Sequence, residues 1–421
     1  MAERLAIDGG PKTIDEPVAP WPQHTGSDED WVVRSVRESN ACASASTAVG
    51  YTIRFEREFA EMHGRRYGVA CCSCTQGLEA MVAIAGIEPG DEVIVPPYTF
   101  MATAACVIRA GGVPVFGDVD PLTMCLDIRR LDEVRTERTK AVIPVHFGGF
   151  MDDMVALRRW AEPLGITVIE DAAQAHAARR DGWYPGEHSM GAVFSFQRNK
   201  NMSAGEGGVY LTDDEDLMLA FREFIWHGTR QGGAPGHFSI SSNLRITEFQ
   251  SALLLAQMER LEEQTRKRMD ACDALDLLID GIPGFTRLDA SAMEVHPRHL
   301  YIVRLDRAYW GGVKKATVLK ALQAEGVVIG AGYDYPLYRN PVFVDGNYPS
   351  VYRAANAEAI AAGRLDFSSV VLPEVERACG DVMTMPHFVF LSDYAVAERV
   401  GSALAKVSEA RDRIAEMDEE A

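Results

Sequence analysis

Lys200 stands at a position where a lysine side chain could do chemistry. It follows the apolar segment Ala192–Phe196 and precedes a glycine-rich turn at 204–208 in this chain of 421 residues. A lysine held in such a turn can be shielded from solvent, and burial lowers the pKa of its amine. A neutral amine can attack a carbonyl carbon or accept a proton. Taken alone, the position fits an exposed surface lysine better, because most lysines are exposed.

Asp171 ends a second apolar segment, Ile166–Glu170. An ionised carboxylate at the edge of an apolar strand needs a partner. The protonated nitrogen of a pyridine ring is such a partner, and the pairing keeps the ring an electron sink. Gln174, three residues later, could hydrogen-bond a phenolic oxygen on the same ring. A carboxylate that caps the turn after the strand explains Asp171 equally well.

A candidate anion site follows the apolar segment Tyr67–Cys71, where Ser73-Cys74-Thr75 precede a predicted helix. Small hydroxyl groups and free backbone N–H groups at a helix N-terminus bind phosphate, although an ordinary N-cap uses the same residue types. The order of anion site, Asp171 and Lys200 along the chain is the order expected of enzymes that bind pyridoxal phosphate (PLP). No G-x-G-x-x-G follows a predicted strand and no G-x-x-x-x-G-K-[ST] occurs, which disfavours dinucleotide and P-loop sites.

Short β-branched segments alternate with amphipathic ones between Tyr67 and Thr212. We expect strands at 67–71, 92–95, 113–116, 141–145, 166–171, 192–196 and 208–212, and helices at 78–84, 101–110 and 153–164. This alternation predicts an α/β fold with a mostly parallel sheet covered by helices on both faces. Such sheets bind ligands beyond the carboxyl ends of their strands. The candidate residues follow these ends, so the fold would bring them together.

The pattern changes in the second half of the chain. A long charged helix is expected at 246–279, followed by a strand at 301–305 and helices at 313–325 and 395–409. Scattered strands and helices of this kind predict a smaller α+β domain. We therefore expect an N-terminal arm at 1–20, a large PLP-binding domain at 21–265 and a small C-terminal domain at 266–421.

Composition excludes several classes of partner. The chain has 42 basic and 61 acidic residues, a formal charge of −19, which argues against nucleic acid or an anionic membrane. No apolar run reaches the roughly 18–20 residues of a membrane helix, and the N-terminus lacks a signal peptide, so a cytoplasmic protein is expected. Cys71 and Cys74 have C-x-x-C spacing, but no second pair completes a zinc site. Buried thiols are preferred over a redox pair, and no metal is expected.

Several longer blocks point to one protein family. They are Phe55–Ala60, Gly90–Pro96, Pro114–Pro121, Glu170–His176, Ser195–Gly208 and Ser242–Arg245 with Gln250. With these blocks the chain resembles the DegT–StrS family of PLP-dependent sugar aminotransferases along almost its whole length. The resemblance implies the fold-type-I architecture of PLP enzymes. That architecture has a large domain with a mostly parallel, seven-stranded type of sheet flanked by helices, and a smaller α+β C-terminal domain.

The resemblance also implies a role for each candidate residue. Lys200 would carry the cofactor as a Schiff base and then move the substrate's α-proton, and Asp171 would hold the pyridinium. The other implied cofactor contacts are Gln174 at the phenolic oxygen, Phe100 stacked on the ring, and Ser73, Cys74, Thr75 and Ser195 around the phosphate. Asn243 would reach the cofactor phosphate of the neighbouring subunit, which implies a homodimer with shared active sites.

Two positions depart from the family pattern. Cys74 and Ala177 stand where the family usually has glycine. A side chain at position 74 could shift the loop that approaches the phosphate, whereas the change at position 177 is expected to have little effect.

Three further segments narrow the resemblance. Asp8–Pro11, Phe194–Gln197 and Gly332–Pro341 look like the branch of glutamine:scyllo-inosose-type aminotransferases, which act on ketocyclitols in antibiotic pathways, and like the aminohydroxybenzoate synthases. Within the last segment, Tyr335, Tyr338 and Arg339 are the expected substrate contacts. For Pro336–Pro341 the alternative interpretation is a rigid turn that lines no site.

The expected function is a ping-pong transfer of an amino group from glutamine or glutamate to a keto-sugar or ketocyclitol, in antibiotic or aminosugar biosynthesis. Three alternatives stay open. A sugar dehydratase of the same fold would replace Lys200 by histidine, so the lysine disfavours it. A PLP-binding regulatory protein would keep the fold without turnover. A synthase of the aminohydroxybenzoate type would add dehydration and aromatisation.

Overall fold

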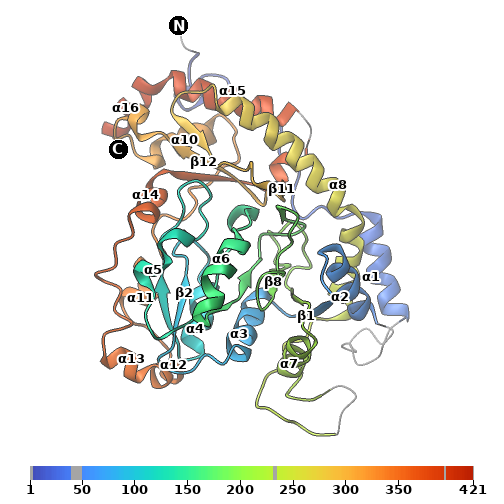
Figure 1. Ribbon diagram of the computed structural model, residues 1–421. Coiled ribbons are helices and arrows are strands. Elements are labelled where there is room, and N and C mark those ends of the chain that lie inside the picture. Colours follow the sequence, from blue (N-terminus) through green and yellow to red (C-terminus); the bar gives the residue numbers. More distant parts are fainter. Residues whose placement is uncertain (1–2, 39–49, 231–234, 393–394, 421) are drawn as a thin grey trace.

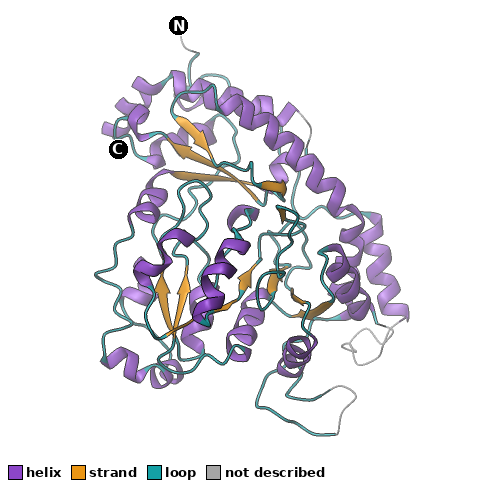
Figure 2. Ribbon diagram, in the orientation of Figure 1, coloured by secondary structure: helices purple, strands orange, loops and turns teal. Residues whose placement is uncertain are grey.

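The first half of the chain alternates between strands and helices, as its sequence predicts. The structure is a computed structural model and describes residues 3–38, 50–230, 235–392 and 395–420 (Figure 1, Figure 2). The strands of this half are β1 (Tyr67–Cys71), β2 (Glu92–Val95), β3 (Val113–Phe116), β4 (Thr139–Val142), β5 (Thr167–Val168), β6 (Glu170–Asp171), β7 (Arg179–Arg180), β8 (Ala192–Ser195) and β9 (Gly208–Thr212). The helices are α1 (Gly26–Glu38), α2 (Tyr51–Met62), α3 (Cys74–Ile84), α4 (Ala102–Arg109), α5 (Leu131–Val134), α6 (Met154–Ala161) and α7 (Glu215–Ile225).

Two four-stranded sheets meet at Ile169. One has the order β3-β2-β4-β5 and is parallel, and the other has the order β1-β9-β8-β6, in which only β9 runs antiparallel to its neighbours. Ile169 lies between β5 and β6 and donates its N–H to Val142, while Glu170 donates to Gly191. The segment 167–171 therefore joins the two sheets, since β5 is an edge strand of one and β6 an edge strand of the other. The predicted α/β class is confirmed, and the strands are arranged as two sheets that share this segment.

Both faces of these sheets are buried, because alternate residues enter different hydrophobic clusters. Val93 and Val95 of β2 pack in a cluster with residues of α3 and α4. Ile94, between them, packs with Leu157 of α6 on the opposite face. The helices therefore cover the strands from both sides, as the apolar strand sequences predict.

Helix α8 (Glu248–Ile279) links two hydrophobic cores. A capping box between Thr247 and Gln250 starts it, and its 32 residues span roughly 48 Å at 1.5 Å per residue. Its first half packs with α2 and the inner strands, and its second half packs with the C-terminal sheet (Figure 1). Within the described ranges, no helix combines the length and the apolar character needed to cross a membrane.

The C-terminal core is built on an antiparallel sheet of order β10-β12-β13. Its strands are β10 (Phe285–Arg287), β12 (Leu300–Leu305) and β13 (Val382–Pro386), and β11 (Met293–Val295) pairs with β7. The surrounding helices are α9 (Arg307–Trp310), α10 (Lys315–Ala324), α14 (Pro373–Asp381), α15 (Ala395–Glu409) and α16 (Arg411–Glu419). Leu5 and Ile14 pack in the same core, so the N-terminal segment lies against it.

Three short helices leave this core and pack on the parallel sheet. They are α11 (Pro341–Val344), α12 (Ser350–Ala355) and α13 (Ala357–Ala361). The rings of Phe343 and Phe367 lie 5.9 and 5.1 Å from Phe116 of β3, within the cluster of the parallel sheet. Part of the chain beyond residue 266 thus belongs to the first core, and the domain boundaries named above stay a prediction.

Candidate active site

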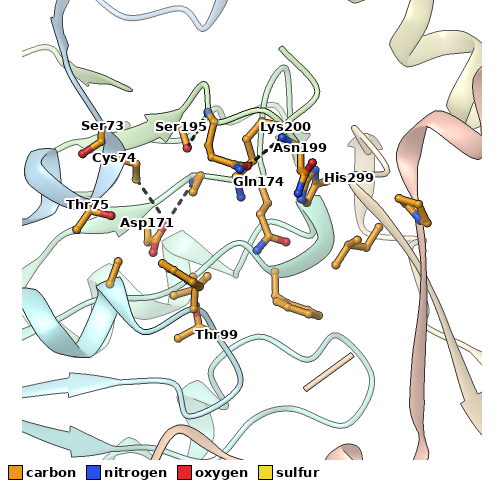
Figure 3. Close-up of a pocket in the computed structure, with 18 of the residues that line it drawn as sticks. Ser73, Cys74, Thr75, Thr99, Asp171, Gln174, Ser195, Asn199, Lys200 and His299 are labelled. Carbon is orange, nitrogen blue, oxygen red and sulfur yellow. Dashed lines mark hydrogen bonds between the residues drawn. The ribbon is translucent and has the colours of Figure 1, made fainter. Parts of the chain in front are cut away.

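A cavity of about 920 Å³ lies beyond the carboxyl ends of β1, β2, β6 and β8. Residues that follow these strands form one wall, and residues of the C-terminal half form the other. Eight of the nine residues predicted to bind the cofactor line it: Ser73, Cys74, Thr75, Phe100, Asp171, Gln174, Ser195 and Lys200. Figure 3 shows most of them converging on the same space. The fold therefore brings together side chains that are up to 127 positions apart in the chain, from Ser73 to Lys200.

The carboxylate of Asp171 is buried beside this cavity and held by a hydroxyl, a backbone N–H and, at a longer distance, the thiol of Cys74. Thr103 Oγ1 of α4 donates to Oδ2 at 2.8 Å, and the backbone N–H of Ala173 donates to Oδ1 at 3.1 Å. No ion pair to this carboxylate is found among the described residues, and burial raises the pKa of Asp171. A protonated ring nitrogen would supply the missing positive charge and offset the cost of burial.

Gln174 is oriented by the turn that follows β4. The N–H of Gly148 donates to Gln174 Oε1 at 2.7 Å. Gly148 has φ 66° and Gly149 has φ 94°, conformations that glycine adopts without a steric penalty. Because the amide oxygen is occupied, the amide nitrogen of Gln174 remains as a donor for an oxygen substituent of a bound ring.

The N-terminus of α3 opens onto the cavity. Ser73 is the N-cap, and its Oγ accepts a hydrogen bond from the N–H of Gln76 at 3.2 Å. The remaining first-turn N–H groups carry the partial positive charge of the helix end. Gly208 of β9 lies directly behind this turn, since a Cβ atom there would be 2.7 Å from Cys74 N. Glycine at position 208, in the predicted glycine-rich turn, therefore allows β9 to pack closely against the backbone of the anion site.

The two departures from the family pattern are accommodated in different ways. Cys74 Sγ lies 3.5 Å from the carbonyl oxygen of Val193 and 4.0 Å from Asp171 Oδ1. Burial, followed by the charge of Asp171, holds the pKa of this thiol well above its usual value, so it stays neutral. Ala177 has φ 64°, which costs a residue with a Cβ about 1–2 kcal/mol and explains why glycine is usual there.

Lys200 lies in a turn that the rest of the chain holds in place. Trp21 Nε1 donates to the carbonyl of Arg198 at 3.0 Å, and His387 Nε2 donates to the carbonyl of Asn199 at 3.2 Å. The Lys200 side chain lines the cavity, and its Nζ has no hydrogen bond within the described part of the chain. Burial lowers the pKa of this amine, while the nearby carboxylate opposes the shift. Such an amine suits a nucleophile or a proton carrier.

Ser195 and Phe100 complete the predicted set within the cavity. Ser195 ends β8 in a buried position, where its Oγ accepts a hydrogen bond from the N–H of Gln197 at 3.3 Å. The carbonyl of Ser195 accepts from His176 Nε2 at 2.8 Å, which fixes the end of the strand. Phe100 lines the cavity and is 64% exposed. An aromatic ring left open in this way suits stacking against a planar ligand.

Two predicted residues lie on the surface, outside the lining of the cavity. Asn243 is exposed, and its Oδ1 accepts a hydrogen bond from Arg245 Nε at 2.8 Å. Tyr335 is 49% exposed. The expected contact of Asn243 with the site of a neighbouring subunit requires such an exposed position and stays a prediction.

Tyr338 and Arg339 are not brought to the cavity. The hydroxyl of the buried Tyr338 donates to Glu376 Oε1 at 2.9 Å. The guanidinium of Arg339 donates to the carbonyls of Ser368 and Val370 at 3.1 and 3.0 Å. Both side chains therefore anchor the segment 368–376, which agrees with the rigid-turn interpretation.

Three residues of the site were not among those predicted. Thr103 holds Asp171, while Tyr333 and His299 line the far wall of the cavity. A threonine on the apolar side of α4 is a signal that could have been noticed. His299 precedes β12, more than 90 positions after Lys200, and no local pattern connects the two.

The donor set fits PLP. Four groups face the cavity: a buried carboxylate, an amide donor, a helix N-terminus and an amine. The carboxylate suits a ring nitrogen, the amide a ring oxygen, the helix N-terminus a phosphate and the amine an aldehyde. These four groups differ chemically, and together they match the four polar ends of the cofactor. Among the residues described, no cluster of three or more His, Cys, Asp or Glu residues could hold a metal ion.

Comparison with known proteins agrees with this geometry. The model of the DegT/DnrJ/EryC1/StrS aminotransferase family matches residues 28–372. The L-glutamine:scyllo-inosose aminotransferase of Streptomyces griseus is 32% identical over 97% of this chain and 98% of its own. The 3-amino-5-hydroxybenzoate synthase of Amycolatopsis mediterranei is 36% identical over 63% of this chain and 68% of its own. A crystal structure of 3-amino-5-hydroxybenzoic acid synthase, 28% identical, superposes with a TM-score of 0.80 and covers 93% of this chain and 98% of that chain.

The family match covers most of the chain and includes the strand ends that carry Asp171 and Lys200. The chain therefore belongs to the DegT/DnrJ/EryC1/StrS family of PLP-dependent aminotransferases.

Proposed function

We propose that the protein transfers an amino group from glutamine or glutamate to the ketone of a ketocyclitol or keto-sugar. The observation that carries the proposal is the cavity in which Lys200, Asp171, Gln174 and the N-terminus of α3 converge. The S. griseus relative, whose name gives glutamine as donor and scyllo-inosose as acceptor, supports the choice of substrates. Biosynthesis of an aminocyclitol antibiotic or an aminosugar is the corresponding biological setting.

PLP, when bound, supplies an electron sink for the carbon that bears the transferred amine. Asp171 would keep the ring nitrogen protonated, and Gln174 Nε2 would donate to the ring oxygen. Ser73, Thr75 and Ser195 would bind the phosphate together with the first N–H groups of α3. Lys200 Nζ would take a proton from the α-carbon of the donor and deliver a proton in the reverse direction on the acceptor.

We further propose a homodimer in which Asn243 completes the partner's site. Asn243 is exposed and lies outside the cavity of its own subunit. Its hydrogen bond with Arg245 leaves the amide nitrogen as a donor, and phosphate oxygens accept such bonds.

The first experiment tests the donor half of the reaction. We expect the PLP-loaded wild-type protein to lose its visible absorption band on addition of L-glutamine or L-glutamate without a ketone. Subsequent addition of scyllo-inosose should restore the band, because the second half-reaction regenerates the starting cofactor. Lys200→Ala should lack the visible band and should not respond to the donors. Lys140→Ala, which removes an exposed lysine of β4, should behave as the wild type.

The possible results separate the alternatives. A wild-type protein that binds PLP but responds to neither donor would contradict the proposed donors and favour a regulatory role. A response to the donor followed by formation of an aromatic product would favour the synthase. If Lys200→Ala kept the visible band, the assignment of Lys200 would be wrong.

A further inference from the structure

The wall of the cavity that the C-terminal half contributes mixes polar and apolar residues and, among the described residues, carries no Asp, Glu, Lys or Arg side chain. It is formed by His299, Leu300, Gly332, Tyr333, Thr384, Pro386 and Phe388. The charged side chains that line the cavity within the described residues are Asp171, Lys200 and Glu206, and none of them belongs to this wall. Recognition of a substrate at the uncharged wall therefore depends on neutral hydrogen bonds and apolar contact.

The ring of His299 is held in one orientation by Asn201, the residue after Lys200. His299 Nδ1 lies 2.8 Å from Asn201 Oδ1, and Asn201 Nδ2 donates to the carbonyl of Pro297 at 2.8 Å. Since the amide nitrogen is used for Pro297, the atom that faces the imidazole is the amide oxygen, an acceptor. Nδ1 of His299 must therefore carry the proton, which leaves a lone pair on Nε2.

Nε2 of His299 is the edge of the ring that remains open to the cavity. It has no hydrogen-bond partner among the described residues. It is also not sealed inside the protein, so a ligand can reach it. The residue lines the same cavity as Lys200 (Figure 3), whose charge acts on its ring. An acceptor atom is thus presented where the substrate must bind to reach Lys200.

The surroundings of His299 favour the neutral ring. Burial, followed by the charge of Lys200 and by His387, holds the pKa of His299 well below its usual value. The ring of His387 stacks on it at a centroid distance of 5.7 Å and an angle of 25°. The other groups that act on it electrostatically are His176 and the buried guanidinium of Arg268, which also disfavour a second proton.

Tyr333 provides the complementary group on the same wall. Its backbone N–H donates to Tyr98 Oη at 3.2 Å, which places the residue, while its own hydroxyl has no partner within the described ranges. Burial raises the pKa of Tyr333 to about 12, so the hydroxyl stays protonated. An acceptor at His299 and a hydroxyl at Tyr333 suit a ring that carries several hydroxyl groups.

We propose that His299 is a specificity residue, whose Nε2 accepts a hydrogen bond from a hydroxyl group of a neutral polyhydroxy ketone. This role rests on the proposed function and deepens it, because it names the substrate class that the uncharged wall selects. Asn201 acts as a positioning residue that keeps Nε2 unprotonated. An acidic or nucleotide-linked substrate would find no cation for its charges on this wall.

The test uses two substitutions of His299 that separate the role of Nδ1 from the role of Nε2. Asparagine places an amide near the position of Nδ1, so His299→Asn keeps the bond to Asn201 and loses the acceptor in the cavity. Glutamine reaches the position of Nε2, so His299→Gln retains a polar group there. We would measure the dissociation constant of scyllo-inositol, which cannot react, by calorimetry on each PLP-loaded protein after conversion with glutamine.

We expect His299→Asn to weaken binding about five- to tenfold, the equivalent of one neutral hydrogen bond. His299→Gln should stay within about threefold of the wild type, since one acceptor replaces another. In His299→Asn, which keeps the bond to Asn201, the reaction with glutamine should slow less than the binding of scyllo-inositol weakens, because the proposed contact concerns the acceptor. Thermal melts of both variants check that the fold is kept.

Equal affinity of all three proteins for scyllo-inositol would overturn the proposal, as would a wild type with no measurable affinity for it. A reaction of His299→Asn with glutamine that slows as much as the binding of scyllo-inositol weakens would also overturn it, since His299 would then act on the turn of Lys200. A wild type that fails to react with any donor would instead refute the proposed function. The scyllo-inositol affinities, measured on the PLP-loaded proteins as they stand, would still decide the role of His299.

Discussion

Asp171 illustrates how a buried charge is kept without a salt bridge. Its carboxylate relies on one hydroxyl, one backbone N–H and the more distant thiol of Cys74, and burial raises its pKa. A protonated ring nitrogen nearby would reverse this shift, because an opposite charge favours the ionised carboxylate. The hydrogen bonds offset only part of the cost of burial, and the positive charge of a ring nitrogen would offset more of it.

Thr103 is the partner of Asp171 that mutation can remove most cleanly. Thr103→Val deletes the 2.8 Å hydrogen bond to Oδ2 but keeps the shape of the side chain. Since this bond lowers the pKa of Asp171, its loss raises that pKa and weakens the hold on the ring nitrogen. We expect kcat/KM to fall about ten- to hundredfold, the usual range for a hydrogen bond to a charged group.

Thr103→Ser is the matched control, because it keeps the hydroxyl and should retain most of the activity. The absorbance of the bound cofactor should be followed across pH in both variants. Only the valine variant should lose ring protonation at a lower pH than the wild type. Equal activity of the valine and serine variants would show that the hydroxyl does not act on Asp171.

The turn after β4 connects an element of the sheet to the site. Its glycines allow the chain to reverse so that Gly148 can donate to Gln174, while residues 148–149 contact the C-terminal half. A Cβ atom on Gly149 would lie 2.7 Å from Pro297 Cγ and 3.1 Å from the carbonyl oxygen of Gln174. The second neighbour is the backbone of Gln174 itself, a residue that lines the cavity, so this turn positions Gln174.

Gly149→Ala should therefore affect both stability and the site. We expect a loss of at least about 3 kcal/mol in the free energy of unfolding, from the positive φ and the steric contact together. The affinity for PLP should fall as well, because Gln174 is displaced. Denaturant titration and cofactor titration measure the two effects.

Gly165→Ala separates the backbone cost from the steric cost. Gly165 has φ 66°, and no atom lies within 4 Å of the added Cβ. We expect this variant to lose only about 1–2 kcal/mol, the cost of the left-handed conformation, with an unchanged affinity for PLP. If both variants lost the same stability, the contact with Pro297 would be unimportant.

At the scale of the whole molecule, segments distant in sequence close around the C-terminal core. Glu325 is fully buried, and it accepts hydrogen bonds from the N–H of Ala6, from Thr13 and from Lys406 Nζ. These bonds hold the pKa of Glu325 below its usual value in spite of burial. The N-terminal segment is therefore an integral part of this core, and Trp21 extends it to the turn of Lys200.

The proposed homodimer makes a prediction at the same scale. Asn243→Ala and Lys200→Ala should each reduce activity, the first by at least about tenfold through the lost phosphate contact. Co-expression of the two variants should restore about a quarter of the wild-type activity, because half of the randomly formed dimers contain one intact site. Mixed dimers isolated with two different tags should show about half of the wild-type activity, because one of their two sites is intact.

No recovery in the mixed dimers would mean that Asn243 does not serve the partner's site. A double variant carrying both changes in one chain, co-expressed with the wild type, is the matched control. Each of the two sites in its mixed dimers has one defect. These mixed dimers should therefore add little to the activity of the wild-type dimers.

The sequence by itself determined the strands, the turn of Lys200 and the residues that follow each strand end. These features are local, because β-branched segments and glycine-rich turns specify their conformation over a few residues. The boundaries of β1, β2, β3, β9 and α15 agree with those expected from the pattern. The order of Ser73, Asp171 and Lys200 also matched the order expected of PLP enzymes, and parallel strand ends meet at one edge of a sheet.

Only the tertiary structure decided which residues form the far wall of the cavity. Tyr338 and Arg339 share a segment with Tyr333, yet they point into packing contacts while Tyr333 lines the cavity. His299 acquires its orientation from Asn201, 98 positions earlier. Such contacts depend on how the C-terminal half packs against the parallel sheet, and no local periodicity records that packing. The residues expected at the cofactor could therefore be named from the chain, whereas the wall that we propose to contact the substrate arises only from the folded molecule.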